Sequence, residues 1–408
     1  MKILSINPIT KKVVESYNIN RKNLYHLPWS SNNNIHAWIE LTNKCNLACI
    51  GCYRENRGEH KSFSQVKKEI DISIEKRNCE KIIIAGGEPL LYPHLERVIK
   101  YISGKNVKPV LLTNGVELTL EKIIKLKQVG LYAIIIHLDS GQNRPGWEDK
   151  NELELNKLRR YYADMVYKAG IEYLSLIMTV HDDTLQYIPD IVLWAQRYVK
   201  KIKRIFFICY RYPIYKTYSE DRKNKKDEKL IYTLDIFNKI REVYPDLHPH
   251  SYLNGTIDKN SLKWLFSTIF FTEKKVIGCM GNRFVKYLTL KYFKNKGRYT
   301  TSFIEGKNKK LDLFVGVLID NSFRKTLLNY FKSVVLNYLK TSRLLFMQSF
   351  IIIQPPGILS NGKVDMCNGC PDAILYKDEF VPSCRLEECL KYGQLLEKIP
   401  INSKQPEN

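Results

Sequence analysis

The sequence of 408 residues lacks any apolar run long enough to cross a membrane. Its longest apolar runs, at residues 313–319 and 350–353, fall far short of the ~20 residues that a spanning helix needs. The N-terminal segment MKILSINPITKKVV also lacks the continuous apolar region of a secretory signal. We therefore expect a protein that stays in the cytoplasm.

Acidic residues are scarce beside basic ones. The chain has 42 Asp and Glu against 65 Lys and Arg, which gives a net charge of +23. Such an excess suits polyanionic partners such as nucleic acid, anionic lipid or phosphorylated substrates, although lysines on solvated faces produce the same excess. Because the sequence contains no nucleic-acid-binding motif, nucleic acid is not expected among the partners.

Ten cysteines are present, and most of them are clustered. In a long chain without an export signal, clustered cysteines indicate metal sites rather than disulfides. At 44% hydrophobic and 26% charged residues, the composition is that of a folded globular protein.

Apolar, β-branched runs alternate with helical patterns over the first half of the chain. We predict strands at residues 35–41, 81–85, 109–113, 131–138, 172–180 and 204–210. The helices between them are predicted at residues 64–75, 94–102, 120–129, 152–168 and 186–199. This alternation predicts an α/β fold with a parallel sheet, and six strands favour a partial (β/α)6 TIM-type barrel over a closed eight-stranded one.

The alternation of strands and helices ends near residue 225. Beyond it, basic runs separate segments that show no βα repeat. We therefore divide the chain into an N-terminal segment (1–34), the partial barrel (35–225) and a cysteine-rich C-terminal extension (226–408). The extension is expected to hold a second metal cluster.

The first cysteine cluster directly follows the first predicted strand. Cys45, Cys49 and Cys52 have the spacing C-x3-C-x2-C. Three thiolates on one loop can hold three corners of a [4Fe-4S] cluster and leave one iron open to a small molecule. A zinc site is the alternative, but no histidine stands nearby at the usual ligand spacing.

This motif resembles the signature of the radical S-adenosylmethionine (SAM) superfamily, and the resemblance covers about residues 35–215. It implies that the methionine part of SAM chelates the open iron. An electron, from a donor of the flavodoxin or ferredoxin type, then cleaves SAM to a 5′-deoxyadenosyl radical that abstracts a substrate hydrogen. One departure is that Gly51 stands where the family usually has an aromatic residue or histidine, with Tyr53 following the last cysteine.

Loops after the later strands strengthen the resemblance. Two glycines allow a sharp bend close to a ligand, and the sequence Gly86-Gly87-Glu88-Pro89 is similar to the family's GGEP motif, which implies contact with the SAM amine. Polar residues also end the next three strands, where the family contacts the rest of SAM. The implied SAM-binding residues are Gly86, Gly87, Glu88, Pro89, Asn114, Asp139, Ser140 and Thr179.

A second set of cysteines lies near the C-terminus. Cys367, Cys370 and Cys384 are the leading ligands, and either Cys279 or Cys389 completes the set. The pattern is similar to the SPASM and twitch extensions that hold auxiliary iron–sulfur clusters, although the spacing differs from the standard one. A four-thiolate zinc site is the alternative.

Residues 321–347 are predicted to form one long helix, with apolar residues such as Phe323 and Phe331 on one face and lysines such as Lys325 and Lys332 on another. Basic amphipathic helices can lie on anionic membranes, although most pack on their own domain. An anionic membrane surface is therefore a candidate partner.

The leading functional hypothesis is a radical SAM enzyme acting on a peptide, a lipid or a small metabolite. The alternative is a non-catalytic zinc- and nucleic-acid-binding protein. Metal analysis separates the two, because only the enzyme requires iron with matching sulfide.

Overall fold

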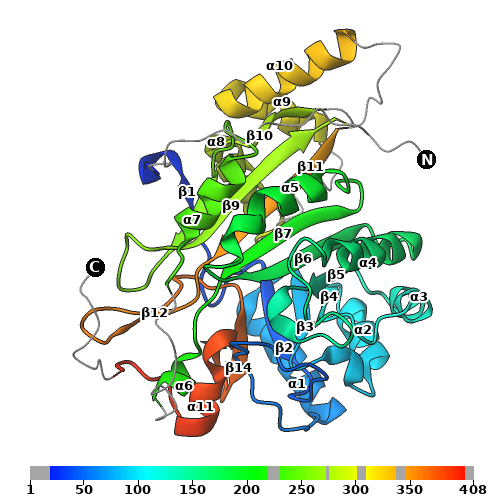
Figure 1. The fold of residues 1–408 in the computed structure, drawn as a ribbon, viewed down its shortest axis with the longest axis vertical. Coiled ribbons are helices and arrows are strands. Elements are labelled where there is room, and N and C mark those ends of the chain that lie inside the picture. Colours follow the sequence, from blue (N-terminus) through cyan, green and yellow to red (C-terminus); the bar gives the residue numbers. More distant parts are fainter. Residues whose placement is uncertain (1–18, 219–228, 273–274, 301–308, 337–344, 400–408) are drawn as a thin grey trace.

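The computed structural model describes residues 19–218, 229–272, 275–300, 309–336 and 345–399. Six strands pair in parallel, each with the next along the chain, as Figure 1 shows. They are β2 (His36–Glu40), β3 (Lys81–Ala85), β4 (Lys108–Thr113), β5 (Ala133–His137), β6 (Tyr173–Val180) and β7 (Ile202–Cys209). The predicted partial (β/α)6 barrel is thereby confirmed.

Each pair of neighbouring strands is joined through a helix. These helices are α1 (Phe63–Arg77), α2 (Leu95–Gly104), α3 (Leu120–Gln128), α4 (Asn156–Lys168) and α5 (Ile188–Gln196). Side chains along β3 alternate between the two faces of the sheet. Ile82 and Ile84 pack in the core that includes the helices, while Ile83 lines a cavity on the other face. Side-chain caps fix helix starts: Ser62 accepts from the backbone of Gln65 at the start of α1.

Segments from both ends of the chain extend this sheet. β11 (Phe346–Ile353) lies between β7, to which it is parallel, and β9 (Leu262–Phe271), to which it is antiparallel. At the opposite edge β14 (Ala373–Tyr376) pairs in parallel with β2 and then with β15 (Glu379–Pro382). β1 (Tyr25–His26) pairs with β8 (Ser251–Asn254), which in turn pairs with β9. The three predicted parts of the chain thus share one sheet, and their division into domains stays a prediction.

The remaining elements surround this frame. They are α6 (Ile214–Tyr218), α7 (Thr233–Arg241), β10 (Val276–Cys279), α8 (Asn282–Lys296), α9 (Lys309–Ile319), α10 (Asn321–Leu336), α11 (Leu386–Tyr392) and a two-stranded ribbon of β12 (Gly357–Ile358) and β13 (Val364–Asp365). In Figure 1, α9 and α10 stand at the upper end of the molecule and α11 at the lower end. Among the described residues, no helix combines the length and apolarity required to cross a membrane.

The predicted helix over residues 321–347 is wrong at its C-terminal end. α10 ends at Leu336, residues 337–344 lie outside the described residues, and Phe346 and Met347 begin β11. The helical spacing of local residues cannot show that this run is flanked by β7 and β9, and pairing on both sides decides its conformation. Phe323 of α10 packs inward against Phe284, whereas Phe331 faces outward.

Candidate active site

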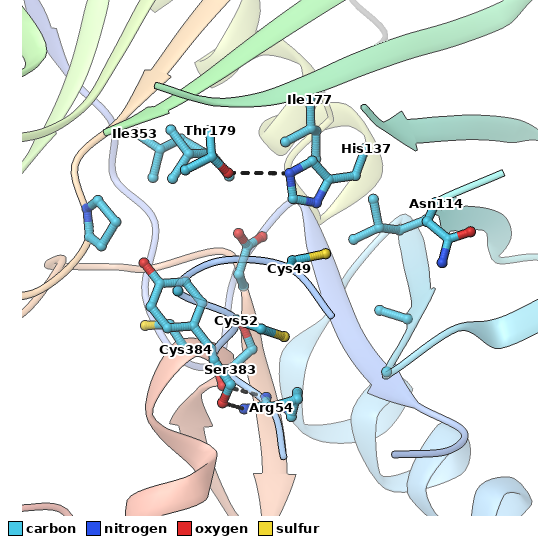
Figure 2. Close-up of a pocket in the computed structure, with 18 of the residues that line it drawn as sticks. Cys49, Cys52, Arg54, Asn114, His137, Ile177, Thr179, Ile353, Ser383 and Cys384 are labelled. Carbon is cyan, nitrogen blue, oxygen red and sulfur yellow. Dashed lines mark hydrogen bonds between the residues drawn. The ribbon is translucent and has the colours of Figure 1, made fainter. Parts of the chain in front are cut away.

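A cavity of about 830 Å³ opens at the carboxyl ends of the parallel strands. Two sets of three cysteines line it: Cys45, Cys49 and Cys52 from the loop after β2, and Cys367, Cys370 and Cys384 from the C-terminal segment. Figure 2 shows Cys49 and Cys52 on one loop with Cys384 beside them. The two groups of cysteines that the sequence singles out therefore meet at one site.

The three thiols of the first cysteine loop lie within electrostatic reach of one another. Cys49 interacts electrostatically with both Cys45 and Cys52, and burial raises the pKa of the Cys45 and Cys49 thiols. A buried thiolate is stable only beside positive charge, which iron ions supply. Asn114 at the end of β4 donates toward Cys45, with 3.9 Å between Nδ2 and Sγ. The donor set thus fits an iron–sulfur cluster.

The two glycines after β3 let that loop press against the cysteine loop. An added Cβ would lie 2.3 Å from the Thr42 oxygen at Gly86 and 2.2 Å from the Lys44 oxygen at Gly87. The Gly87 N–H donates to the Thr42 carbonyl at 2.7 Å, and the Glu88 N–H donates to the Lys44 carbonyl at 2.8 Å. Both glycines also line the cavity. Close backbone packing on the cysteine loop is therefore one physical reason for the glycine pair.

Glu88 is buried behind this loop. Its carboxylate accepts from the Thr113 hydroxyl at 2.6 Å, from the Asn114 N–H at 2.8 Å and from the Leu90 N–H at 3.0 Å. Burial raises its pKa in spite of these bonds. Glu88 ties the β3 loop to the end of β4, and it lies outside the residues that line the cavity, as do Pro89 and Ser140.

A polar group at the ends of β5 and β6 faces the cavity. Asp139 accepts from His137 Nε2 at 2.8 Å and from the Thr179 N–H at 2.8 Å, and Figure 2 shows His137 pointing toward Thr179. Burial opposes ionisation of Asp139, but His137 and the bonds from Thr179 lower its pKa overall. Asp139 therefore stays a carboxylate beside the cysteine loop.

Arg144 is a buried cation that no motif in the sequence singles out. Its Nη2 donates to the Asn114 carbonyl at 2.6 Å and to Gln142 Oε1 at 2.9 Å, while its buried Nε and Nη1 atoms have no hydrogen-bond partner among the described residues. It interacts electrostatically with Cys49 and Asp139. A buried guanidinium with two spare donors suits an anionic group at this place, such as a thiolate-bound cluster.

Tyr210 explains the glycine at position 51. The Gly51 backbone has φ of 70°, and an added Cβ would lie 2.4 Å from the Tyr210 ring. That ring stacks on His181 with 4.0 Å between centroids. An aromatic pair supplied by the ends of β6 and β7 thus stands beside the place where the family usually has an aromatic side chain.

The second set of cysteines is held against the barrel. Cys367 and Cys370 are hydrogen-bonded through their side chains, and this bond together with burial raises the pKa of Cys370. Burial also raises the pKa of Cys384, which interacts with Cys370. Arg77, fully buried in α1, donates to the carbonyls of Cys370 at 2.8 Å and Pro371 at 2.7 Å. Within the described part of the chain, no three His, Cys, Asp or Glu side chains are placed to share a single metal ion.

Cys279 and Cys389 stand apart from that set. The Cys279 thiol, at the end of β10, donates to the Asp246 carbonyl at 3.7 Å. Cys389, in α11, packs in an apolar cluster with Ile374, Val381 and Leu386. The charged neighbours of both thiols are Asp, Glu, Lys and Arg side chains.

Residues 39–195 match the family model of the Radical SAM superfamily. Over these residues the chain therefore carries a radical SAM domain.

Among curated proteins, the chain is 39% identical over 108 residues to "Probable GTP 3',8-cyclase" of Methanococcus maripaludis, covering 25% of this chain and 35% of the relative. It is 36% identical over 112 residues to the antilisterial bacteriocin subtilosin biosynthesis protein AlbA of Bacillus subtilis, covering 26% of this chain and 24% of the relative. The chain thus spans well under half the length of these two relatives. Among solved structures, Streptococcus suis SuiB bound to S-adenosylmethionine is 18% identical, with a TM-score of 0.39 over 53% of this chain and 48% of that one.

Proposed function

We propose that this protein cleaves SAM reductively at a [4Fe-4S] cluster held by Cys45, Cys49 and Cys52. The observation that supports this most is the meeting, in one cavity, of those three thiols with the glycine loop and the polar strand ends. Cys45, Cys49 and Cys52 would hold the cluster, and a reduced cluster bound there would supply the one electron needed to split SAM into methionine and a 5′-deoxyadenosyl radical able to take a hydrogen atom from the substrate. A one-electron donor of the flavodoxin or ferredoxin type supplies that electron.

The chain's own residues position SAM and exclude water. Gly86 and Gly87 allow close backbone approach, Asn114 and Asp139 offer polar groups, and Thr179 offers its hydroxyl. The loops themselves are fixed by residues outside the cavity lining, namely Glu88, Pro89 and Ser140. Apolar side chains of the barrel interior, Ile83, Leu112, Ile135, Ile177 and Ile208, form the walls.

Cys367, Cys370 and Cys384 are proposed to hold an auxiliary iron–sulfur cluster in the same cavity. Their position in the lining that also contains the first set supports this, while the isolation of Cys279 and Cys389 supports a packing role for those two thiols. In this proposal residues 35–225 carry the SAM chemistry and residues 226–408 supply the second cluster. A cavity of about 830 Å³ holds SAM with the reacting part of a peptide, a lipid or a small metabolite.

Anaerobic reconstitution with iron and sulfide, followed by dithionite and SAM, tests the proposal through the 5′-deoxyadenosine formed. Replacement of Cys45, Cys49 and Cys52 by Ala is expected to abolish formation, while Cys209→Ala, which removes an isolated buried thiol, preserves it. Iron content should be about eight per chain for two cubanes and about four after Cys367, Cys370 and Cys384 are replaced. A protein that takes up only zinc would overturn the proposal.

A further inference from the structure

α9 and α10 form a helix pair with an unusual distribution of polarity. They follow each other with only Asp320 between them, and they pack against each other at the end of the molecule opposite α11 (Figure 1). The cavity is lined by residues from 36 to 264 and from 353 to 384, so the helix pair takes no part in it.

The outer face of this pair is largely apolar, with one exposed cation, Arg324, whose guanidinium donates to the carbonyls of Val317 and Leu318. Leu311, Phe314 and Leu318 recur at helical spacing on α9, and Leu328, Phe331 and Val335 do so on α10. These six side chains are between 54% and 72% exposed. We call them the outer stripe. Single exposed apolar residues are ordinary on a protein surface, but two adjacent stripes on neighbouring helices indicate a surface that something apolar covers.

Polar groups of the same helices point inward instead. Asp312 accepts from the Tyr287 hydroxyl at 3.1 Å and pairs with Lys291, both on α8. Asp320 accepts from the backbone N–H of Phe284 at 3.0 Å and of Phe323 at 2.9 Å. The pair is thus turned so that its acidic groups are satisfied inside while large apolar groups face outward. α10 also buries Phe323 in the core, so the pair has an apolar inner face as well as an apolar outer stripe.

The charged residues beside the outer stripe indicate what kind of partner covers it. Lys325 and Lys332 are exposed, and their separation of seven residues places both along one edge of the stripe on α10. The acidic residues of the pair, Asp312 and Asp320, are both buried. Apolar side chains flanked by lysines suit a membrane surface of anionic lipid, where the chains enter the acyl boundary and the ammonium groups meet headgroups.

A second copy of the chain suits this surface less well. A two-fold symmetric contact through the same face would enclose lysines of both copies in one interface, where the acidic residues Asp312 and Asp320 are too buried to neutralise them.

We infer that the outer stripe of α9 and α10 docks this protein on an anionic membrane surface, with the two helices lying in the interface rather than crossing the bilayer. The inference is independent of the proposed SAM chemistry.

Vesicle flotation of the holoenzyme tests this inference. The protein should float with vesicles of phosphatidylcholine mixed with phosphatidylglycerol and not with phosphatidylcholine alone. Binding should weaken as added salt shortens the screening length. The double variant Phe314→Ser/Phe331→Ser should bind about tenfold or more weakly, since two large apolar side chains no longer enter the lipid. Tyr161→Ser/Tyr167→Ser, two exposed tyrosines on α4, is the matched control and should bind like wild type.

Charge reversal tests the basic edge separately. Lys325→Glu/Lys332→Glu should abolish the preference for anionic vesicles, whereas Lys168→Glu on α4 should not. Failure to float with anionic vesicles would overturn the inference, as would stripe variants that float like wild type. A wild-type dimer in sedimentation, which Phe314→Ser/Phe331→Ser dissociates, would assign the face to a second copy instead. SAM cleavage by each variant checks that it is folded.

Discussion

At Gly51 the absence of a side chain is what allows Tyr210 to lie over the cysteine loop. The position combines left-handed backbone with a distance of only 2.4 Å between an added Cβ and the Tyr210 ring. Gly58, on the same loop, has a similar φ of 74° but open space around it. Comparing alanine substitutions at these two glycines therefore distinguishes the cost of backbone strain from the cost of a steric clash.

Gly51→Ala is expected to destabilise the protein by about 2 kcal/mol more than Gly58→Ala, because only the first substitution also overpacks the site. Gly58→Ala should cost about 1 kcal/mol through backbone strain alone. Urea unfolding of the two variants gives the comparison. In a Tyr210→Ala background the extra cost at Gly51 should largely vanish, and an unchanged cost would contradict the contact.

His250 makes stability depend on pH. It is buried, with Ser251 Oγ at 2.9 Å and Thr268 Oγ1 at 3.2 Å, and burial lowers its pKa to about 3. Because the unfolded chain takes up a proton near pH 6.5 that the folded chain does not, the stability from this group is lost as pH falls below that value. Between pH 7 and 5.5 the loss should be about 1 kcal/mol. In His250→Gln this part of the pH dependence should disappear from urea unfolding, and equal slopes for both proteins would contradict it.

At the scale of elements, α1 holds the second cysteine segment through a fully buried side chain, Arg77. Arg77 donates to the carbonyls of Cys370 and Pro371 and, through Nε, to the His36 carbonyl of β2 at 2.8 Å. The C-terminal segment is thereby fixed to the first strand of the barrel, beside the pairing of β14 with β2.

Arg77→Met should leave these carbonyls without their charged donor and cost about 3 kcal/mol. We also expect iron to fall toward about four per chain, because the second set of cysteines loses its position. Arg160→Met is the control, since the Arg160 side chain is 63% exposed and its ion pair with Asp164 spans 3.6 Å. Full iron content in Arg77→Met would show that the cysteine segment keeps its position without the hydrogen bonds from Arg77.

For the whole molecule, local sequence patterns predict the barrel well and the C-terminal half poorly. The six parallel strands are visible because each is an apolar run followed by a helical repeat. β9, β11 and β14 are not, because their places beside β7 and β2 depend on pairing partners distant in sequence.

The same distinction holds for the site. Spacing identifies the two cysteine sets, and polar residues at strand ends identify Asn114, Asp139 and Thr179. Arg144 and Tyr210 reach the site only through the fold. The sequence marks Arg144 merely as a charged residue shortly after Asp139, and Tyr210 merely as an aromatic residue at the end of a strand. Nothing local shows that Glu88 lies outside the cavity lining.

Electron paramagnetic resonance of the reduced, reconstituted protein tests most directly whether Cys45, Cys49 and Cys52 hold a cluster that binds SAM. SAM should change the signal of wild type and of the variant that lacks Cys367, Cys370 and Cys384. It should leave unchanged the signal of the variant that lacks Cys45, Cys49 and Cys52. A wild-type protein with a full iron load whose signal SAM does not alter would contradict the assignment.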